Sequence, residues 1–174
     1  LLSLINITLD ISEAESGVMK LNLEKVNLAD IVEEVAEMFR PAAEEKSLSL
    51  QVKAEPNISI LADSHRLFQV AANLVDNALK YTPSGGNITI SVELKDNSAI
   101  LSVSDTGVGI PSEEVPKIFQ RFYRSEESRS ASGFGLGLSV AQAIVHAHGG
   151  EIRVESSPGK GSDFKVLLPP TIER

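Results

Sequence analysis

Three short stretches of this sequence combine residue types that could bind a phosphorylated ligand. The first stretch places two amides and a cation, Asn73, Asn77 and Lys80, at intervals of four and three residues. Such intervals put the three side chains on one face of a helix. Amide oxygens suit a hard cation such as Mg²⁺, which retains waters and phosphate oxygens as further ligands. A solvated polar helix face would have the same composition, so this stretch alone leaves both interpretations open.

The second stretch begins at Asp105, which continues the alternation of Leu101 and Val103 at the end of a predicted strand. Its side chain should therefore point toward the apolar side of the sheet, where a carboxylate must be hydrogen-bonded. Gly107 and Gly109 follow and allow the backbone to approach a ligand closely. An acceptor beside an apolar surface suits a base with an exocyclic amine. An Asp that caps its own turn is the competing interpretation.

The third stretch, residues 133–138 (GFGLGL), opens a predicted helix with three glycines. Unpaired amides and the positive end of the helix dipole can hold an anion there. The spacing matches neither a Walker loop nor a Rossmann fingerprint, and a flexible hinge is the alternative. The polar segment between the second and third stretches contains Arg121, Arg124 and Arg129. Its length and flanking glycines predict a lid.

Composition restricts the classes to which the chain can belong. It has 174 residues, of which 42% are hydrophobic, a net charge of −8 and no cysteine. This length and apolar content predict one domain, and the lack of cysteine excludes disulfides and cysteine-based zinc sites. The acidic balance argues against nucleic acid as a partner, so a phosphate-bearing ligand must be held by local groups. No apolar run reaches the roughly 20 residues of a membrane span.

Alternation and helical periodicity predict the elements that carry these stretches. We expect helices near 28–42 after an Asn27 cap, at 64–80 after an Asp63 cap, and at 138–148. Six alternating runs predict strands near 48–52, 58–60, 88–94, 101–105, 152–154 and 164–168. Residues 20–26 are interpreted as a short extended connection. Together these elements predict an α+β protein, a two-layer sandwich whose sheet is wet on one face and covered by three helices on the other.

In their order along the chain, four motifs resemble those of the catalytic and ATP-binding domain of sensor histidine kinases, within the GHKL ATPase superfamily. Residues 73–82 (NLVDNALKYT) are similar to the N box, and 105–111 (DTGVGIP) to the first glycine box. Residues 118–124 (IFQRFYR) are similar to the F box, and 133–138 to the second glycine box. The resemblance covers roughly residues 27–169. It implies a Bergerat-type fold, whose mixed and mostly antiparallel sheet has about five or six strands.

The resemblance also implies a role for each matching residue. Asn77 would coordinate Mg²⁺, and Asn73 would assist it or bind phosphate. Lys80 would reach a phosphate, Asp105 would accept from the adenine amino group, and Arg124 would approach the terminal phosphate when the lid closes. The implied catalytic residues are Asn73, Lys80 and Arg124.

The resemblance implies further ATP-binding positions, which would form a pocket wall, a lid contact and a phosphate cradle. They are Tyr81, Gly107, Gly109, Ile110, Phe119, Arg121, Gly133, Gly135, Leu136, Gly137, Leu138 and Ser162. The backbone amides of the last glycine motif would cradle the phosphate chain. Ser162 stands where the family often has Thr near the adenine, so it keeps the hydroxyl and loses a methyl.

The implied activity is transfer of the γ-phosphoryl group of Mg-ATP to a His on the dimerisation domain, for relay to an Asp of a response regulator. The family's phosphoacceptor lies upstream of Leu1, and His65, His146 and His148 have no comparable context. We therefore expect a fragment that binds ATP or ADP without autophosphorylating. It should be mainly monomeric and cytoplasmic, and cut from a homodimeric, membrane-anchored protein.

The expected division of the chain follows from the same resemblance. Residues 1–17 would be the end of the dimerisation hairpin, 18–26 a linker, and 27–172 the catalytic domain with an ATP lid at about 107–135. Two alternatives remain at this point. One is a degenerate GHKL domain that acts as a partner-binding module. The other is a GHKL ATPase that hydrolyses ATP, although such enzymes usually have Glu where Asn73 stands.

Overall fold

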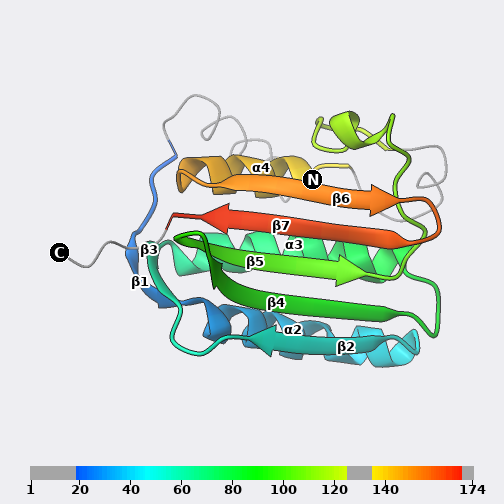
Figure 1. Ribbon diagram of the computed structural model, residues 1–174, viewed down its shortest axis with the longest axis horizontal. Coiled ribbons are helices and arrows are strands. Elements are labelled where there is room, and N and C mark those ends of the chain that lie inside the picture. Colours follow the sequence, from blue (N-terminus) through cyan, green and yellow to red (C-terminus); the bar gives the residue numbers. More distant parts are fainter. Residues whose placement is uncertain (1–18, 125–134, 170–174) are drawn as a thin grey trace, which may run out of the picture.

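The computed structural model describes residues 19–124 and 135–169, which form two layers (Figure 1). The main sheet has the order β2 (Ser49–Ala54), β4 (Asn87–Lys95), β5 (Ser98–Asp105), β7 (Gly161–Leu168), β6 (Glu151–Ser157). Helices α2 (Leu28–Glu45), α3 (Ser64–Tyr81) and α4 (Gly137–Ala147) cover one of its faces. Only β2 and β4 are parallel; the other neighbours are antiparallel. The predicted two-layer α+β architecture, with a mixed and mostly antiparallel sheet, is confirmed.

The core lies between this sheet and the three helices. Val103 of β5 is opposite Phe164 of β7, which is in turn opposite Val154 of β6. These three residues form a row across the strands, and they point toward the helices. Because side chains alternate along each strand, the paired residues two positions before and after this row point the same way. In the described residues, no helix combines the length and apolar character that crossing a membrane requires.

Both predicted helix caps are confirmed. The Asn27 side chain accepts from the amide of Ala29 at 3.3 Å, and the Asp63 side chain accepts from the amide of Arg66 at 3.0 Å. These bonds satisfy amides that have no partner within the helix. At the other end of α3, Lys46 Nζ donates to the carbonyl of Leu79 at 2.6 Å, a favourable place for a cation. The start and the end of α3 are therefore both held by specific hydrogen bonds.

One predicted element differs from the structure. The extended connection expected at 20–26 ends in strand β1 (Glu24–Asn27), which continues one residue beyond it and pairs with β3 (Ser59–Ala62) as a separate antiparallel ribbon. Val26 and Ile60 lie opposite each other and are both buried, so this ribbon is part of the core. The sequence pattern did not reveal the pairing because a strand partner some 35 residues away leaves no local signature.

Asp63 joins three segments at the end of the molecule where α3 begins. Its Oδ2 accepts from the amide of Asn22 at 2.9 Å, and its own amide donates to His148 Nε2 at 3.0 Å. Because Nε2 accepts, the proton is on Nδ1, which lies 2.8 Å from the carbonyl of Ile144. Burial raises the pKa of the Asp63 carboxyl, but the hydrogen bonds from the amides of Arg66 and Asn22, together with the positive charge of Arg66, outweigh burial, so the pKa is lowered.

Candidate functional site

Three polar side chains stand in one row across the ends of β5, β7 and β6. Asp105 is opposite Ser162, and Ser162 is opposite Ser156. This row is two residues beyond Val103 and Phe164, so it points to the same, helix-covered side. The structure thus confirms that the half-buried Asp105 faces the apolar side where its strand ends.

The two interpretations of Asp105 turn out to be compatible. Its Oδ1 accepts from the amide of Gly107 at 2.8 Å, which caps its own turn, and from the amide of Ser162 at 3.3 Å. These bonds leave Oδ2 as the oxygen that could meet a ligand. Burial raises the pKa of this carboxyl, the negative charge of Asp163 adds to the rise, and the two amides oppose it without cancelling it. An acid held in such an unfavourable environment is typical of functional sites.

The first glycine stretch is packed between two other backbone segments. The amide of Val108 donates to the carbonyl of Tyr81 at 3.1 Å, and its carbonyl accepts from the amide of Gly159 at 2.7 Å. A Cβ added at Gly109 would lie 2.0 Å from the carbonyl oxygen of Ser157, and one at Gly107 would lie 2.5 Å from that of Tyr81. The sequence pattern predicted close approach to a ligand, whereas the closest neighbours of these glycines are protein backbone.

The first and third stretches meet where α4 begins. Asn73 Nδ2 donates to the carbonyl of Gly137 at 3.1 Å, which leaves its amide oxygen for another partner. Residue Leu136 caps α4 without a side-chain hydrogen bond, so the capping residue itself does not occupy the first amides of this helix. Lys80 forms an ion pair with Asp76 at 2.5 Å on the half-buried face of α3. The second half of α3 therefore extends from Asn73, which contacts α4, to Tyr81, which contacts the first glycine stretch. Asn77 and Lys80 lie between these two contacts.

The predicted lid is only partly within the described residues. Gly133 and Arg129 lie outside them, and Arg124 is the last residue described before the gap. The amide of Phe122 donates to the carbonyl of Gly135 at 3.0 Å, so residues on the two sides of the gap are hydrogen-bonded. Before the gap, this segment contains a short 3-10 helix, Val115–Lys117.

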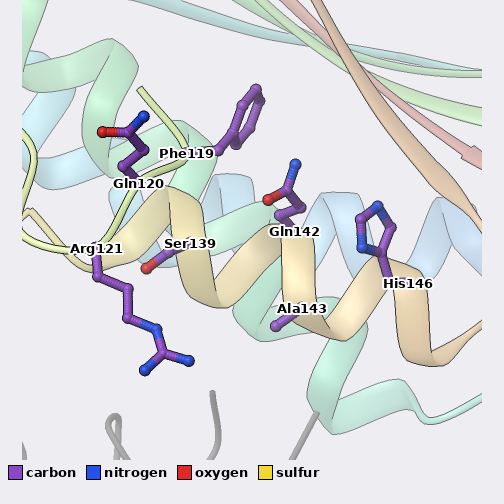
Figure 2. A pocket seen from close by; sticks show the side chains of 7 residues that line it. All are labelled: Phe119, Gln120, Arg121, Ser139, Gln142, Ala143 and His146. Atoms are coloured by element: carbon purple, nitrogen blue, oxygen red, sulfur yellow. The ribbon is translucent and has the colours of Figure 1, made fainter. Parts of the chain in front are cut away.

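A pocket of about 460 Å³ lies between the F-box segment and α4 (Figure 2). Phe119 and Arg121 line it from the loop, and Ser139, Gln142 and His146 line it from the helix. The lining contains none of Asp105, Ser162, Asn73 or Asn77. The structure therefore brings Phe119 and Arg121 to α4, in a place distinct from the polar row.

Ser156 is the residue of this region that sequence reasoning missed. Its Oγ accepts from the amide of Ile110 at 2.8 Å, donates to the carbonyl of Gly161 at 2.8 Å, and lies 2.9 Å from Ser162 Oγ. A signal was present in the sequence. Ser156 continues the alternation of Ile152 and Val154 by two residues, as Asp105 continues that of Leu101 and Val103.

The raised pKa of Asp105 predicts that this residue destabilises the ligand-free protein at neutral pH. Below its usual pKa of 3.8, the Asp105 carboxyl is neutral in both the folded and the unfolded chain, so it costs no stability there. As pH rises from 3.8 through the raised pKa of the folded state, the unfolded chain loses this proton more readily and the folded protein loses stability. We expect Asp105→Asn to have a higher melting temperature than the wild type at pH 7. The difference should shrink toward zero as pH is lowered to about 3.5.

Thermal unfolding followed by circular dichroism would measure this difference. Asp96→Asn, in the exposed turn after β4, controls for the removal of one negative charge from an acidic protein. A lower melting temperature for Asp105→Asn than for the wild type at pH 7 would contradict the expectation.

The packing of Gly109 predicts a second measurable difference. Gly109 and Gly159 have nearly the same backbone angle, φ +73 and +74, but only Gly109 has neighbours that an added Cβ would meet. Gly159→Ala should cost about 1–2 kcal/mol for the left-handed conformation. Gly109→Ala should cost about 1–3 kcal/mol more, because the Ser157 carbonyl must move. Denaturant unfolding of both variants measures the two costs, and equal values would show that the contact does not matter.

Comparison with known proteins identifies the family. A family model described as "Histidine kinase-, DNA gyrase B-, and HSP90-like ATPase" matches residues 62–172. The sensor histidine kinase WalK of Bacillus subtilis strain 168 is 33% identical over 173 residues, which cover 97% of this chain and 28% of WalK. The chain spans between 21 and 44% of the length of curated relatives such as WalK.

Solved structures agree with this family. Full-length ShkA in complex with AMPPNP superposes with a TM-score of 0.87 at 30% identity, over 98% of this chain and 36% of that chain. The catalytic domain of histidine kinase ThkA, in a nucleotide-free form, has a TM-score of 0.77 at 30% identity, over 87% of this chain and 99% of that chain. The chain therefore belongs to the histidine kinase-, DNA gyrase B- and HSP90-like ATPase family, and within it to the catalytic domains of sensor histidine kinases.

Proposed function

We propose that this chain binds Mg-ATP and transfers the γ-phosphoryl group to a His on the dimerisation domain of its own full-length protein, for relay to an Asp of a response regulator. The observation that carries the proposal is the arrangement along α3. Its end contacts the glycine stretch beside Asp105, and its middle contacts the start of α4 through Asn73. One helix therefore contacts both the segment that follows Asp105, the proposed acceptor for a base, and the start of α4, the proposed site for phosphates. Similarity to ShkA, which was solved with AMPPNP, supports ATP as the nucleotide.

At the base end, Asp105 Oδ2 would accept from the adenine amino group. Ser162 is directly opposite Asp105 and would lie beside the same group. Gly107, Gly109 and Ile110 would form the wall of the pocket, and Tyr81 would line it from the end of α3. Ile110 is suited to this role because it packs partly against the core and so presents an apolar surface.

At the phosphate end, the amides of residues 135–138 would hold the phosphate chain at the start of α4. Lys80 would exchange its partner Asp76 for a phosphate. Ion pairs with partly exposed partners contribute little to stability, so this exchange costs little. Arg124, with Arg121 as a second candidate, would approach the terminal phosphate. Phosphoryl transfer depends mainly on such positioning and charge stabilisation.

The donor set of α3 fits a magnesium ion that is held largely by its substrate. In residues 19–124 and 135–169, no group of three or more His, Asp or Glu side chains could hold a metal by itself. Mg²⁺ needs few protein ligands when phosphates and waters supply the rest. Asn77 would supply an amide oxygen, and Asn73 would add its oxygen or bind phosphate. The bound ion would neutralise charge on the transferred group.

The remaining parts of the assignment concern the longer protein. Residues 1–17 would be the end of the dimerisation hairpin, 18–26 the linker, and 27–172 the catalytic domain with its lid at about 107–135. The pairing of β1 with β3 attaches the end of that linker to the catalytic domain. We propose a cytoplasmic domain that is monomeric alone and part of a membrane-anchored homodimer at full length.

ATP binding is tested by titrating the chain with AMPPNP and Mg²⁺ in a calorimeter. We expect saturable binding by the wild type, and at least tenfold weaker binding by Asp105→Asn and by Asn77→Ala, since each loses a charged or metal-linked contact. Asp163→Asn is the matched control, because Asp163 is opposite Ser104 and so faces the other side of the sheet. Equal binding by all four proteins, or none by the wild type, would refute the assignment.

Hydrolysis is the alternative that the site disfavours. An amide cannot take a proton from water, and Asn73 already donates to Gly137, so it offers no general base. We expect phosphate release by the isolated chain, followed with a coupled assay, to stay at the background of an ATP–Mg²⁺ solution. Sustained turnover that disappears in Asn77→Ala would instead favour an ATP-hydrolysing enzyme.

A further inference from the structure

We propose that Ser156 is a positioning residue that decides which base the site accepts. By fixing the direction of the Ser162 hydroxyl, Ser156 makes Ser162 a hydrogen-bond acceptor only. The site then favours a purine with an exocyclic amine at position 6 over a purine with an oxygen there. This inference rests on the proposed function, because it requires a nucleotide base beside Asp105.

The direction of the hydroxyl follows from counting donors and acceptors around Ser156. A serine hydroxyl has one hydrogen and two lone pairs. The amide of Ile110 can only donate, so at 2.8 Å it occupies one lone pair of Ser156 Oγ. The carbonyl of Gly161 can only accept, so at 2.8 Å it takes the single hydrogen.

The third contact of Ser156 is thereby determined. Ser162 Oγ lies 2.9 Å from Ser156 Oγ, and distance alone would allow either hydroxyl to donate. Because the hydrogen of Ser156 is directed at Gly161, Ser162 must be the donor. Ser162 has then used its only hydrogen, and lone pairs are all that it can offer to another group.

This polarity matters because Ser162 stands beside Asp105. The two residues are opposite each other in the β5–β7 pair, and the amide of Ser162 donates to Asp105 Oδ1 at 3.3 Å. Asp105 Oδ2 and Ser162 Oγ therefore form a pair of acceptors on the same side of the sheet. An amino group has two N–H bonds and can satisfy both acceptors. A 6-oxo group would place its own lone pairs against them and would remain unsatisfied next to the buried Ser162.

Ser156 also holds the Ile110 segment to β7, so its loss could weaken the site in general. A general effect lowers the affinity for every nucleotide by the same factor. The proposed effect changes the ratio between two nucleotides. ATP and inosine triphosphate form the appropriate pair of probes, because their bases differ at position 6 and the adjoining N1 and share the same sugar and phosphates.

The experiment measures the dissociation constants of both nucleotides, with Mg²⁺, for four proteins. In Ser156→Ala the Ser162 hydroxyl can rotate and donate to a 6-oxo group, so the preference for ATP should fall about tenfold. Ser156→Thr keeps a hydroxyl and should restore the wild-type ratio. The double variant Ser156→Ala/Ser162→Ala lacks the freed donor, so it should bind inosine triphosphate more weakly than Ser156→Ala does.

A fifth protein, Ser162→Ala, tests the proposal even if Ser156→Ala does not fold. It should bind ATP several times more weakly and inosine triphosphate no more weakly than the wild type. Equal losses for the two nucleotides in Ser156→Ala, or in Ser162→Ala, would overturn the role of Ser156 while leaving ATP binding intact. If the wild type bound neither nucleotide, the proposed function itself would fail.

Discussion

The pairing register of β5, β7 and β6 is the constraint on which the rest of the site depends. Side chains alternate along a strand, so a shift of the pairing register by one residue would move Asp105 from the helix-covered face of the sheet to the solvent-exposed face. Gly161 helps to hold this register. A Cβ there would lie 1.9 Å from the carbonyl oxygen of Asp105, so only glycine lets β7 begin so close to β5. The same register places Val103 and Phe164 in the core and, two residues further along the strands, places Asp105, Ser162 and Ser156 side by side.

Helix α3 connects this row to the residues that we propose for phosphate binding. Its first turn is held by Asp63, which also contacts Asn22 and His148, and its last turn is held by Lys46. Asn73 and Tyr81 are eight residues apart, which is about 12 Å along a helix. The contacts of Asn73 with α4 and of Tyr81 with the glycine stretch therefore set a fixed spacing between the two ends of the proposed nucleotide site.

An acidic protein can serve a phosphate-bearing ligand because its groups act locally. The net charge of −8 describes the whole surface, whereas screening confines each exposed charge to about a Debye length. Backbone amides at the start of α4, one lysine and amide oxygens need no basic surface around them. Lys80 illustrates this, since its charge is partly balanced by Asp76 in the structure and would turn to a phosphate only in the proposed complex.

The sequence by itself determined the features that depend on near neighbours. Strand alternation placed Asp105 on the apolar side, capping residues located the starts of α2 and α3, and four ordered motifs indicated the family. Only the tertiary structure decided what distant segments do to one another. It paired β1 with β3, surrounded Gly109 with the Ser157 backbone, and directed the hydroxyl of Ser156 at Gly161. The physical reason is range: propensity and periodicity act over a few residues, whereas register and hydrogen-bond direction depend on which strands come to lie side by side.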